Sequence, residues 1–372
     1  MKPVRVLQVV QGLHCGGTEM VIMNWLRHID LEKIRFDFAL YTLEDNFFAP
    51  EAQRLKARIF TITPSQFNSR KTAWQLAYNL YRLIRQEGPF QAMHTHEEQP
   101  FVAGLELLAA WCARVPKRLT ISHVDRNIYE DGVRINPLKL FIGRLLIRLF
   151  STHRLVVSQA AGRAMYGNKI SFQMIHNGID VEKFAYNLSK RAEIRQQLGL
   201  SDDTVVLGTV GRLTDQKNSL FTLAVFNEFQ KIRPNSKLLM IGKGPLREKI
   251  MQQAQAWGLD EKLILLQDID NVYDYYQAMD FFLFPSLFEG LGIVLVEAQA
   301  AGLACAVADT VPHEAFICNV QVLSLQDSAA NWAQNIHACM QNFVRKDETQ
   351  SIKKAGFDAA DVGAFIQAIY LK

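Results

Sequence analysis

The chain has 372 residues, of which 49% are apolar and 21% charged, and its formal net charge is +4. Such a length predicts about two domains, and the composition is typical of a soluble globular enzyme. The five cysteines are scattered without a C-x-x-C pair, which excludes a disulfide framework and a zinc ribbon. No signal peptide and no run of about 18 uncharged apolar residues occurs, so we expect a cytoplasmic protein without a membrane span.

The charge is distributed unevenly along the chain. Residues 1–180 contain 23 Lys and Arg against 15 Asp and Glu, whereas the remaining residues contain 18 against 22. A basic first half predicts an anionic partner for that half. Anionic lipid and nucleic acid both fit the charge alone.

Short apolar runs alternate with longer amphipathic segments along the whole chain. The first half predicts strands at 4–10, 36–41, 58–63, 91–94, 117–122 and 155–158. It predicts helices at 19–28, 71–86 and 101–113. The second half predicts strands at 205–210, 237–241, 263–266, 281–284 and 304–308. Its predicted helices lie at 219–232, 245–257, 272–279, 293–301 and 357–371. Because strands and helices alternate, and the pattern starts again near residue 205, the sequence predicts two tandem α/β domains with parallel sheets.

The first polar motif, Gly16-Gly17-Thr18-Glu19, lies between the first predicted strand and helix. Ligands bind beyond the carboxyl ends of strands in such sheets. The glycines would let backbone N–H groups contact a diphosphate at the helix N-terminus. A tight turn with Thr18 as N-cap and Glu19 in the first helical turn explains the same residues. The motif alone fits both interpretations.

Histidines follow two other predicted strands of the first half. His94 and His96 lie at the end of one strand, and His123 follows the next. Imidazole rings can exchange hydrogen bonds with a sugar or stabilise charge. Since no carboxylate or cysteine with metal-ligand spacing accompanies them, we interpret the histidines as part of a polar cleft.

A basic amphipathic segment occupies residues 134–154. It contains four spaced cations, Arg134, Lys139, Arg144 and Arg148. It also contains an apolar stripe at helical spacing, formed by Leu138, Phe141, Ile142, Leu145 and Leu149. A helix of this kind can lie on an anionic bilayer. The alternative is a helix whose stripe packs on the sheet while the cations extend into solvent.

Two cations follow the first strand of the second half. Arg212 and Lys217 come directly after the predicted strand 205–210. Arginine binds phosphate oxygens in a bidentate manner and lysine adds a compact charge, so the pair suits a diphosphate that gains charge as it leaves. After the next strand, Gly242-Lys243-Gly244 fits either a nucleotide contact or a common strand-to-helix turn.

One D-x-D sequence occurs, Asp268-Ile269-Asp270. This pattern holds a divalent metal in some sugar-nucleotide enzymes. Here it precedes the helix predicted from Val272, where Asp270 fits the N-cap position. We therefore expect no metal to be required.

The segment 284–314 contains two acids around a glycine turn. Glu289 precedes Gly290 and Gly292, and Glu297 lies in the helix predicted from Ile293. A helix N-terminus binds anions, whereas carboxylates beside it accept hydrogen bonds from hydroxyls. A ligand with both phosphate and hydroxyl groups, such as a sugar nucleotide, fits this arrangement.

With these motifs the chain resembles the retaining glycosyltransferases of family 4 over nearly its whole length. The resemblance comes from GGTE at 16–19, SH at 122–123, HNGID at 176–180, GRLTDQKN at 211–218, IGKGPLRE at 241–248 and the E-x7-E motif within 284–302. It implies two Rossmann-like domains in the GT-B architecture with an interdomain cleft. The expected acceptor-side domain spans 1–180, and the nucleotide-sugar domain spans 181–355. Residues 356–372 are expected to return as a helix to the first domain.

The resemblance also implies roles for individual residues. Arg212 and Lys217 would bind the donor diphosphate, Glu289 the transferred sugar and Glu297 the ribose. His123 would lie beside the donor sugar. Further donor contacts are expected from Gly16, Gly17, Gly242, Gly290, Leu291, Gly292 and Ile293. His14 and Cys15 depart from the small or polar residues that the family predicts there, which puts acceptor contacts in that loop in question.

Together these features predict a retaining hexosyltransferase of cell-surface polysaccharide synthesis, in the exopolysaccharide and capsule subgroup. It would move a sugar from a nucleoside diphosphate to a glycan or a polyprenyl-diphosphate-linked glycan, on the inner face of the membrane and without a cofactor. Alternatives are a nucleotide-sugar epimerase or hydrolase of the same fold and a non-catalytic sugar-nucleotide-binding protein. A NAD-dependent dehydrogenase is disfavoured because no G-x-G-x-x-G follows the opening strand. Nucleic acid is not an expected partner.

Overall fold

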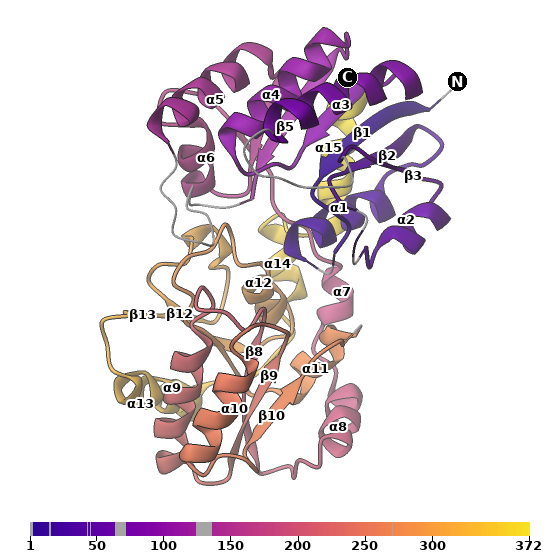
Figure 1. Ribbon diagram of the computed structural model, residues 1–372. Helices are drawn as coiled ribbons and strands as arrows, with labels where there is room; N and C mark the ends of the chain where they lie inside the picture. Colours follow the sequence, from indigo (N-terminus) through magenta and orange to yellow (C-terminus); the bar gives the residue numbers. More distant parts are fainter. Residues whose placement is uncertain are drawn as a thin grey trace. The chain divides into compact units, whose positions relative to one another are not determined.

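The structure is a computed structural model that describes residues 3–14, 16–42, 44, 46–63, 72–123, 136–269 and 271–372. The chain divides into two compact units, shown in Figure 1. The first unit consists of Met1–Ile179 with Asp358–Lys372, and the second of Asp180–Phe357. Each unit is built on one parallel sheet accompanied by helices, so the predicted α/β class with two tandem parallel-sheet domains is confirmed.

The first unit alternates strands and helices. Its strands are β1 (Val4–Val10), β2 (Ile34–Leu40), β3 (Arg58–Thr61), β4 (Ala92–Thr95), β5 (Lys117–Ser122), β6 (His153–Val156) and β7 (Gln173–Met174). Its helices are α1 (Gly17–His28), α2 (Ala49–Arg54), α3 (Thr72–Glu87), α4 (Pro100–Cys112), α5 (Pro137–Phe150), α6 (Gln159–Tyr166) and α15 (Ala359–Leu371). The sheet has the order β3-β2-β1-β4-β5-β6-β7, with parallel neighbours throughout. The strand order reverses between β1 and β4, which makes their carboxyl ends the expected ligand position.

The last helix of the chain belongs to this first sheet. In Figure 1 the yellow α15 runs beside α1, and it contacts α1, β1 and β2. Ala359 N donates to the Ile179 carbonyl at 2.9 Å, where the chain leaves the first unit. The Tyr370 ring packs edge-on against Phe36 at 5.7 Å. The C-terminal helix thereby completes the apolar core around β1 and β2.

The second unit repeats the pattern. Its strands are β8 (Val205–Val210), β9 (Ser236–Ile241), β10 (Leu263–Leu266), β11 (Phe281–Phe284), β12 (Ala304–Ala308) and β13 (Val320–Leu323). Its α-helices are α7 (Val181–Phe184), α8 (Leu188–Gln197), α9 (Ser219–Ile232), α10 (Arg247–Ala256), α11 (Val272–Ala278), α12 (Ile293–Ala300), α13 (Ala329–Asn342) and α14 (Thr349–Lys354). The parallel sheet has the order β10-β9-β8-β11-β12-β13. Its order reverses between β8 and β11, so the loops after these strands form its ligand-binding edge.

Central strands follow the predicted bounds closely, whereas β7 and β13 were not predicted. β7 is the two-residue strand Gln173–Met174 at the edge of its sheet. β13 is also an edge strand, and only one of its four residues, Leu323, is buried. Edge strands lack the continuous apolar run of a strand covered on both faces, which explains why the sequence pattern does not reveal them.

Candidate active site

The loops after β8 and β11 meet around a partly buried ion pair. Lys217 Nζ lies 2.5 Å from Glu289 Oε1, and the exposed fractions of the two side chains are 19% and 7%. Lys217 Nζ also lies 5.2 Å from the centre of the Phe284 ring, at the end of β11. Limited solvent screening strengthens the interaction between these charges. The structure therefore brings together the cation and the acid that the sequence identified separately.

Gln216 joins the same two loops and was not identified from the sequence. Its side-chain Nε2 donates to the Phe288 carbonyl at 3.1 Å, and its main-chain carbonyl accepts from Leu287 N at 2.8 Å. Arg212 Nη2 lies 3.5 Å from Gln216 Oε1. Gln216 thus holds the exposed Arg212 side chain near the loop that contains Glu289.

A small pocket lies beside the ion pair. Its lining includes Gly211, Arg212, Lys217, Phe284 and Ser286. Ser286 Oγ is buried and has no hydrogen-bond partner in the described part of the chain. Because an unsatisfied buried hydroxyl is costly, this atom is well suited to bond a ligand group.

The glycine turn after Glu289 is shaped by its packing. Gly292 has φ +88° and immediately precedes α12. A Cβ at this position would lie 2.8 Å from the Phe284 ring, so both the backbone conformation and the space require glycine. Gly290 and Leu291 are buried beside it, and Ile293 is partly buried at the first helical position. The turn directs the N-terminus of α12 towards the carboxyl edge of the sheet, where anions are favoured.

Glu297 lies one turn further along α12 and is bonded to α11. Tyr276 Oη donates to Glu297 Oε2 at 2.8 Å. Burial raises the pKa of Glu297 to about 7, although the Tyr276 hydroxyl opposes this shift by bonding the charged form. The carboxyl consequently titrates near neutral pH.

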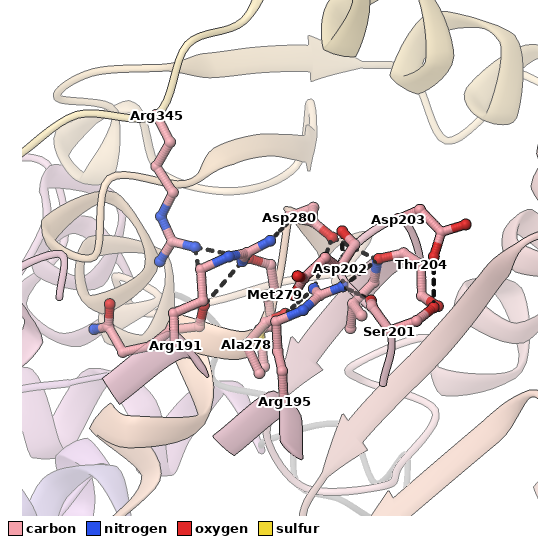
Figure 2. A network of polar contacts seen from close by, with 12 residues as sticks. Arg191, Arg195, Ser201, Asp202, Asp203, Thr204, Ala278, Met279, Asp280 and Arg345 are labelled. Carbon is pink, nitrogen blue, oxygen red and sulfur yellow. Dashed lines mark hydrogen bonds and ion pairs between the residues drawn. The ribbon is translucent and has the colours of Figure 1, made fainter. Parts of the chain in front are cut away.

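An arginine network holds the end of α11 in place (Figure 2). Arg345 donates to the carbonyls of residues 276, 277, 279 and 301. Arg191 and Arg195 form ion pairs with Asp280 at 2.6 and 3.4 Å. Burial lowers the pKa of Arg345 to about 9. The network fixes α11, and therefore the Tyr276 hydroxyl that bonds Glu297.

Gly242 occupies a structural turn. Its φ is +151°, and a Cβ would clash with the Gly211 carbonyl. Leu213 N donates to the Lys243 carbonyl at 2.7 Å, so the loops after β8 and β9 are bonded directly to each other. This close backbone packing accounts for Gly242 without a ligand.

The D-x-D sequence is only partly described, because Asp270 lies outside the described residues. Asp268 forms an ion pair with Lys243. Asn271 is the N-cap residue of α11, and the role expected for Asp270 as the cap falls outside the described residues. In the described ranges, no group of three or more His, Cys, Asp or Glu side chains has a metal-binding arrangement.

Three histidines of the first unit, His94, His96 and His123, are buried together. His96 Nδ1 lies 3.2 Å from His123 Nε2, and the His94 and His96 ring centres are 4.5 Å apart. Burial lowers the pKa of His123 to about 4, and those of His94 and His96 well below the ordinary value. Gln8 and Tyr370, which the sequence analysis did not connect to them, bond His96 and His94. Neutral imidazoles are thus held in a polar cluster beneath the carboxyl ends of β1, β4 and β5.

The Gly16-Gly17 motif starts α1 without a side-chain cap. The helix begins at Gly17 with Gly16 as its N-cap residue, so the interpretation of Thr18 as the N-cap is wrong. Among the described residues, a Cβ on Gly17 would meet no atom within 4 Å. Cys15, part of the departure from the family pattern, lies outside the described residues.

Helix α5 turns its predicted apolar stripe outward. Leu138, Phe141 and Leu149 are 63%, 66% and 62% exposed, which contradicts the alternative in which this stripe packs on the sheet. Arg144, by contrast, donates to the Ala164 carbonyl at 2.8 Å, and burial lowers its pKa. Arg134 lies outside the described residues, whereas Lys139 and Arg148 are exposed. No described helix is long and apolar enough to cross a membrane.

Both halves of the sequence match glycosyltransferase families. Residues 15–183 match the family described as Glycosyltransferase Family 4, and residues 190–356 match Glycosyl transferases group 1. The glycosyltransferase EpsF of Bacillus subtilis (strain 168) is 32% identical over 97% of this chain and 95% of its own length. The capsular polysaccharide biosynthesis glycosyltransferase CapH of Staphylococcus aureus is 23% identical over 80% of this chain and 79% of its length. A galactosyltransferase of Escherichia coli, named for UDP-Gal and a GlcNAc-diphosphoundecaprenol acceptor, is 28% identical over 62% of this chain and 60% of its length.

Solved structures show the same fold. Anabaena HepE in complex with UDP and glucose superimposes with a TM-score of 0.79, at 17% identity over 98% of this chain and 99% of HepE. Sucrose-phosphate synthase from Thermosynechococcus elongatus gives a TM-score of 0.77, at 16% identity over 99% of this chain and 98% of the synthase. These likenesses confirm the predicted GT-B fold. The two family matches and the Bacillus subtilis relative, which aligns over nearly the full length, establish that the chain is a glycosyltransferase and belongs to family 4, in the exopolysaccharide and capsule group.

Proposed function

We propose that this glycosyltransferase moves a sugar from a nucleoside diphosphate to a lipid-linked glycan with retention of anomeric configuration. The observation that carries the proposal is the Lys217–Glu289 pair beside Arg212, at the switch point of the second sheet. HepE structures contain UDP or UDP-glucose, and the E. coli relative is named for a diphosphoundecaprenol acceptor. These proteins support a uridine diphosphate donor and a polyprenyl-diphosphate-linked acceptor.

The two cations suit the leaving group. The bond between the anomeric carbon and the diphosphate oxygen breaks while the acceptor hydroxyl forms its bond on the same face of the sugar. The acceptor proton passes to the departing diphosphate, so charge and atoms balance without a protein nucleophile. Arg212 and Lys217 stabilise the charge that develops on the diphosphate. The turn from Gly290 to Ile293 adds the dipole of α12.

The two acids have different tasks in this proposal. Glu289 accepts hydrogen bonds from hydroxyls of the transferred sugar, and Lys217 balances its charge before the reaction. Glu297 binds the ribose, with its orientation set by Tyr276. Two contacts from the first unit remain predictions: that of His123 with the sugar, and that of Gly16 and Gly17 with the diphosphate.

Paired variants test the proposal in transfer assays with UDP-, GDP- and ADP-linked sugars and a polyprenyl-diphosphate-linked sugar. We expect Lys217→Met and Glu289→Gln to lower kcat by at least about 100-fold, the effect of losing one electrostatic contact to the transition state. Lys231→Met is the matched control, since Lys231 forms an exposed ion pair with Glu228 on α9, and it should retain full activity. Wild-type rates for both site variants would refute the assignment.

Product analysis separates the proposed reaction from its alternatives. NMR of the product should show the anomeric configuration of the donor, and inversion would exclude retention. Incubation with the donor alone should leave the sugar unchanged. A new epimer or free sugar formed at the rate of transfer would favour the epimerase or hydrolase alternative.

We further propose that the outward face of α5 binds an anionic membrane, at the inner face where lipid-linked acceptors would be reached. The exposed apolar residues of α5 lie among the cations Lys139 and Arg148. Two exposed aromatic residues lie near α5: the Trp74 ring of α3 packs against Phe101 of α4 at 6.4 Å, and the Trp111 ring of α4 packs against Phe150 of α5 at 5.2 Å. Lys139 Nζ lies 5.9 Å from the centre of the Phe101 ring of α4. Aromatic, aliphatic and basic groups on one surface fit the interface of an anionic bilayer.

Vesicle flotation tests this surface. The protein should bind vesicles of phosphatidylglycerol more strongly than vesicles of phosphatidylcholine. Phe141→Ser with Leu149→Ser should abolish flotation, and Arg148→Glu should weaken it. Leu188→Ser is the matched control, because Leu188 is 70% exposed in the second unit. Equal flotation of the Phe141/Leu149 variant and the wild type would refute the proposal.

A further inference from the structure

Five side chains form one continuous hydrogen-bond chain through the first unit. Gln8 Nε2 donates to Tyr370 Oη at 3.1 Å, and Tyr370 Oη lies 2.7 Å from His94 Nδ1. At the other end of the amide, Gln8 Oε1 lies 2.9 Å from His96 Nε2. His96 Nδ1 then lies 3.2 Å from His123 Nε2. All five residues are buried. The hydrogen-bond chain therefore links α15 to His123, the histidine predicted to lie beside the sugar.

The proton positions in this chain depend on one another. An amide oxygen can only accept, so His96 Nε2 must carry a proton to bond Gln8 Oε1. Neutral His96 then has a bare Nδ1, which accepts from His123 Nε2–H. His123 is left with its own Nδ1 bare. Burial favours the neutral form of both imidazoles, which keeps this assignment consistent.

The bare nitrogen of His123 is not satisfied within the protein. His123 Nδ1 is buried and has no hydrogen-bond partner in the described part of the chain. Leaving a buried acceptor unpaired destabilises the protein. A ligand that donates a hydrogen bond to Nδ1 recovers this cost, whereas a ligand that presents another acceptor does not.

We propose that Tyr370, Gln8 and His96 are positioning residues that hold His123 in the tautomer with a bare Nδ1, so that this atom accepts a hydrogen bond from a hydroxyl of the bound sugar. The ligand in this inference rests on the proposed function, whereas the tautomer rests on the hydrogen-bond chain with the Gln8 amide nitrogen toward Tyr370. The inference makes His123 a hydrogen-bond acceptor and not a proton donor to the reaction.

The orientation of the Gln8 amide, the pivot of the hydrogen-bond chain, determines the proton positions of all its members. Rotating the amide by half a turn would present its NH2 group to His96 and would reverse every proton, leaving Nδ1 of His123 protonated. In the observed orientation the Tyr370 oxygen accepts from the amide, and it also lies 2.7 Å from His94 Nδ1. Removing the Tyr370 hydroxyl takes away the partner that the amide nitrogen has in this orientation, without touching His123.

Nitrogen NMR of protein labelled with 15N-histidine tests the tautomer directly. In the wild type, His123 should show a bare Nδ1 and a protonated Nε2. Tyr370→Phe should populate the second tautomer and lower kcat/KM by about three- to tenfold, the effect of losing one neutral hydrogen bond. A protonated Nδ1 in the wild type would overturn the inference and leave the transfer activity of the proposed function intact.

The matched control is Tyr166→Phe. Tyr166 is equally buried in the first unit. Its hydroxyl donates to the carbonyls of Thr120 and Leu155, which are not part of the hydrogen-bond chain. Its loss should change kcat/KM by less than about twofold and leave the nitrogen spectrum of His123 unchanged. Gln8→Leu provides a second variant that removes the pivot itself and should mix the tautomers. An unchanged His123 tautomer in both Tyr370→Phe and Gln8→Leu would refute the positioning role, whatever their activity.

Discussion

The carboxyl of Glu106 allows a quantitative test of the interior of the first unit. Glu106 lies on α4, is 1% exposed and accepts hydrogen bonds from the hydroxyls of Tyr41 and Thr95. Burial, with the charge of Glu97 adding to it, raises the pKa of Glu106 from 4.5 to about 8. The folded protein therefore keeps this proton at neutral pH, whereas the unfolded chain releases it.

This difference makes stability depend on pH with a defined sign. The contribution of the bound proton is fully present below pH 4.5 and is lost as the pH rises to 8 and beyond. Within that window each pH unit costs about 1.4 kcal/mol, and the loss levels off near the folded pKa, so the first unit should lose roughly 2 kcal/mol between pH 6 and pH 8. Glu106→Gln keeps the side chain neutral in both states and should remove this dependence.

Hydrogen exchange by mass spectrometry measures the effect in the full chain. Peptides from β4 and α4 give free energies of opening at pH 6, 7 and 8, after correction for the intrinsic exchange rate. The stability of the variant relative to the wild type should increase by roughly 2 kcal/mol between pH 6 and pH 8. Peptides of the second unit serve as an internal control. Parallel pH profiles for the variant and the wild type would show that Glu106 is ionised in the folded protein.

Three further predictions concern the second unit. Tyr276→Phe removes a hydrogen bond to the charged form of Glu297, so the acid limb of the pH profile of kcat/KM should move to higher pH; an unmoved limb would separate Glu297 from activity. Gly292→Ala should lower the urea unfolding free energy by roughly 3 kcal/mol, because a left-handed φ and the Phe284 ring both oppose the methyl group. Gly258→Ala, also left-handed but with no atom near its Cβ, should cost only about 1 kcal/mol, and equal losses would refute the packing argument. Transfer activity should persist after dialysis against EDTA, and its loss with recovery on adding Mg²⁺ would require a metal.

Central strands were predictable because burial on both faces imposes a continuous apolar run. The bounds of the central strands β1, β5, β8, β11 and β12 agree with the predicted ones, and so do those of the edge strand β10, whose residues are all apolar. β2 begins at Ile34, two residues before the predicted start, because Arg35 interrupts the apolar pattern while the backbone still pairs with β1. Strand pairing through the backbone does not require an apolar side chain at every position.

Contacts between distant residues were not predictable from spacing. The sequence separated Lys217 from Glu289 by 72 positions, and only the topology of the sheet brings the two loops together. Gln8 and Tyr370 are 362 positions apart, and neither belongs to a motif. For α5, helical periodicity defined an apolar stripe but did not indicate whether protein or solvent covers it. These contacts and exposures depend on tertiary packing, which the local pattern of one sequence does not reveal.

The position of α15 also determines when each unit can complete its folding during synthesis. The second unit is one uninterrupted stretch from Asp180 to Phe357, and all of its strands are translated before α15. The first unit begins earlier but lacks Tyr370, whose carbonyl accepts from Lys117 Nζ at 2.7 Å, and Gln367, whose side chain accepts from Asp30 N at 2.7 Å. Since domains fold as units during translation, the domain that the ribosome starts first acquires its native contacts last.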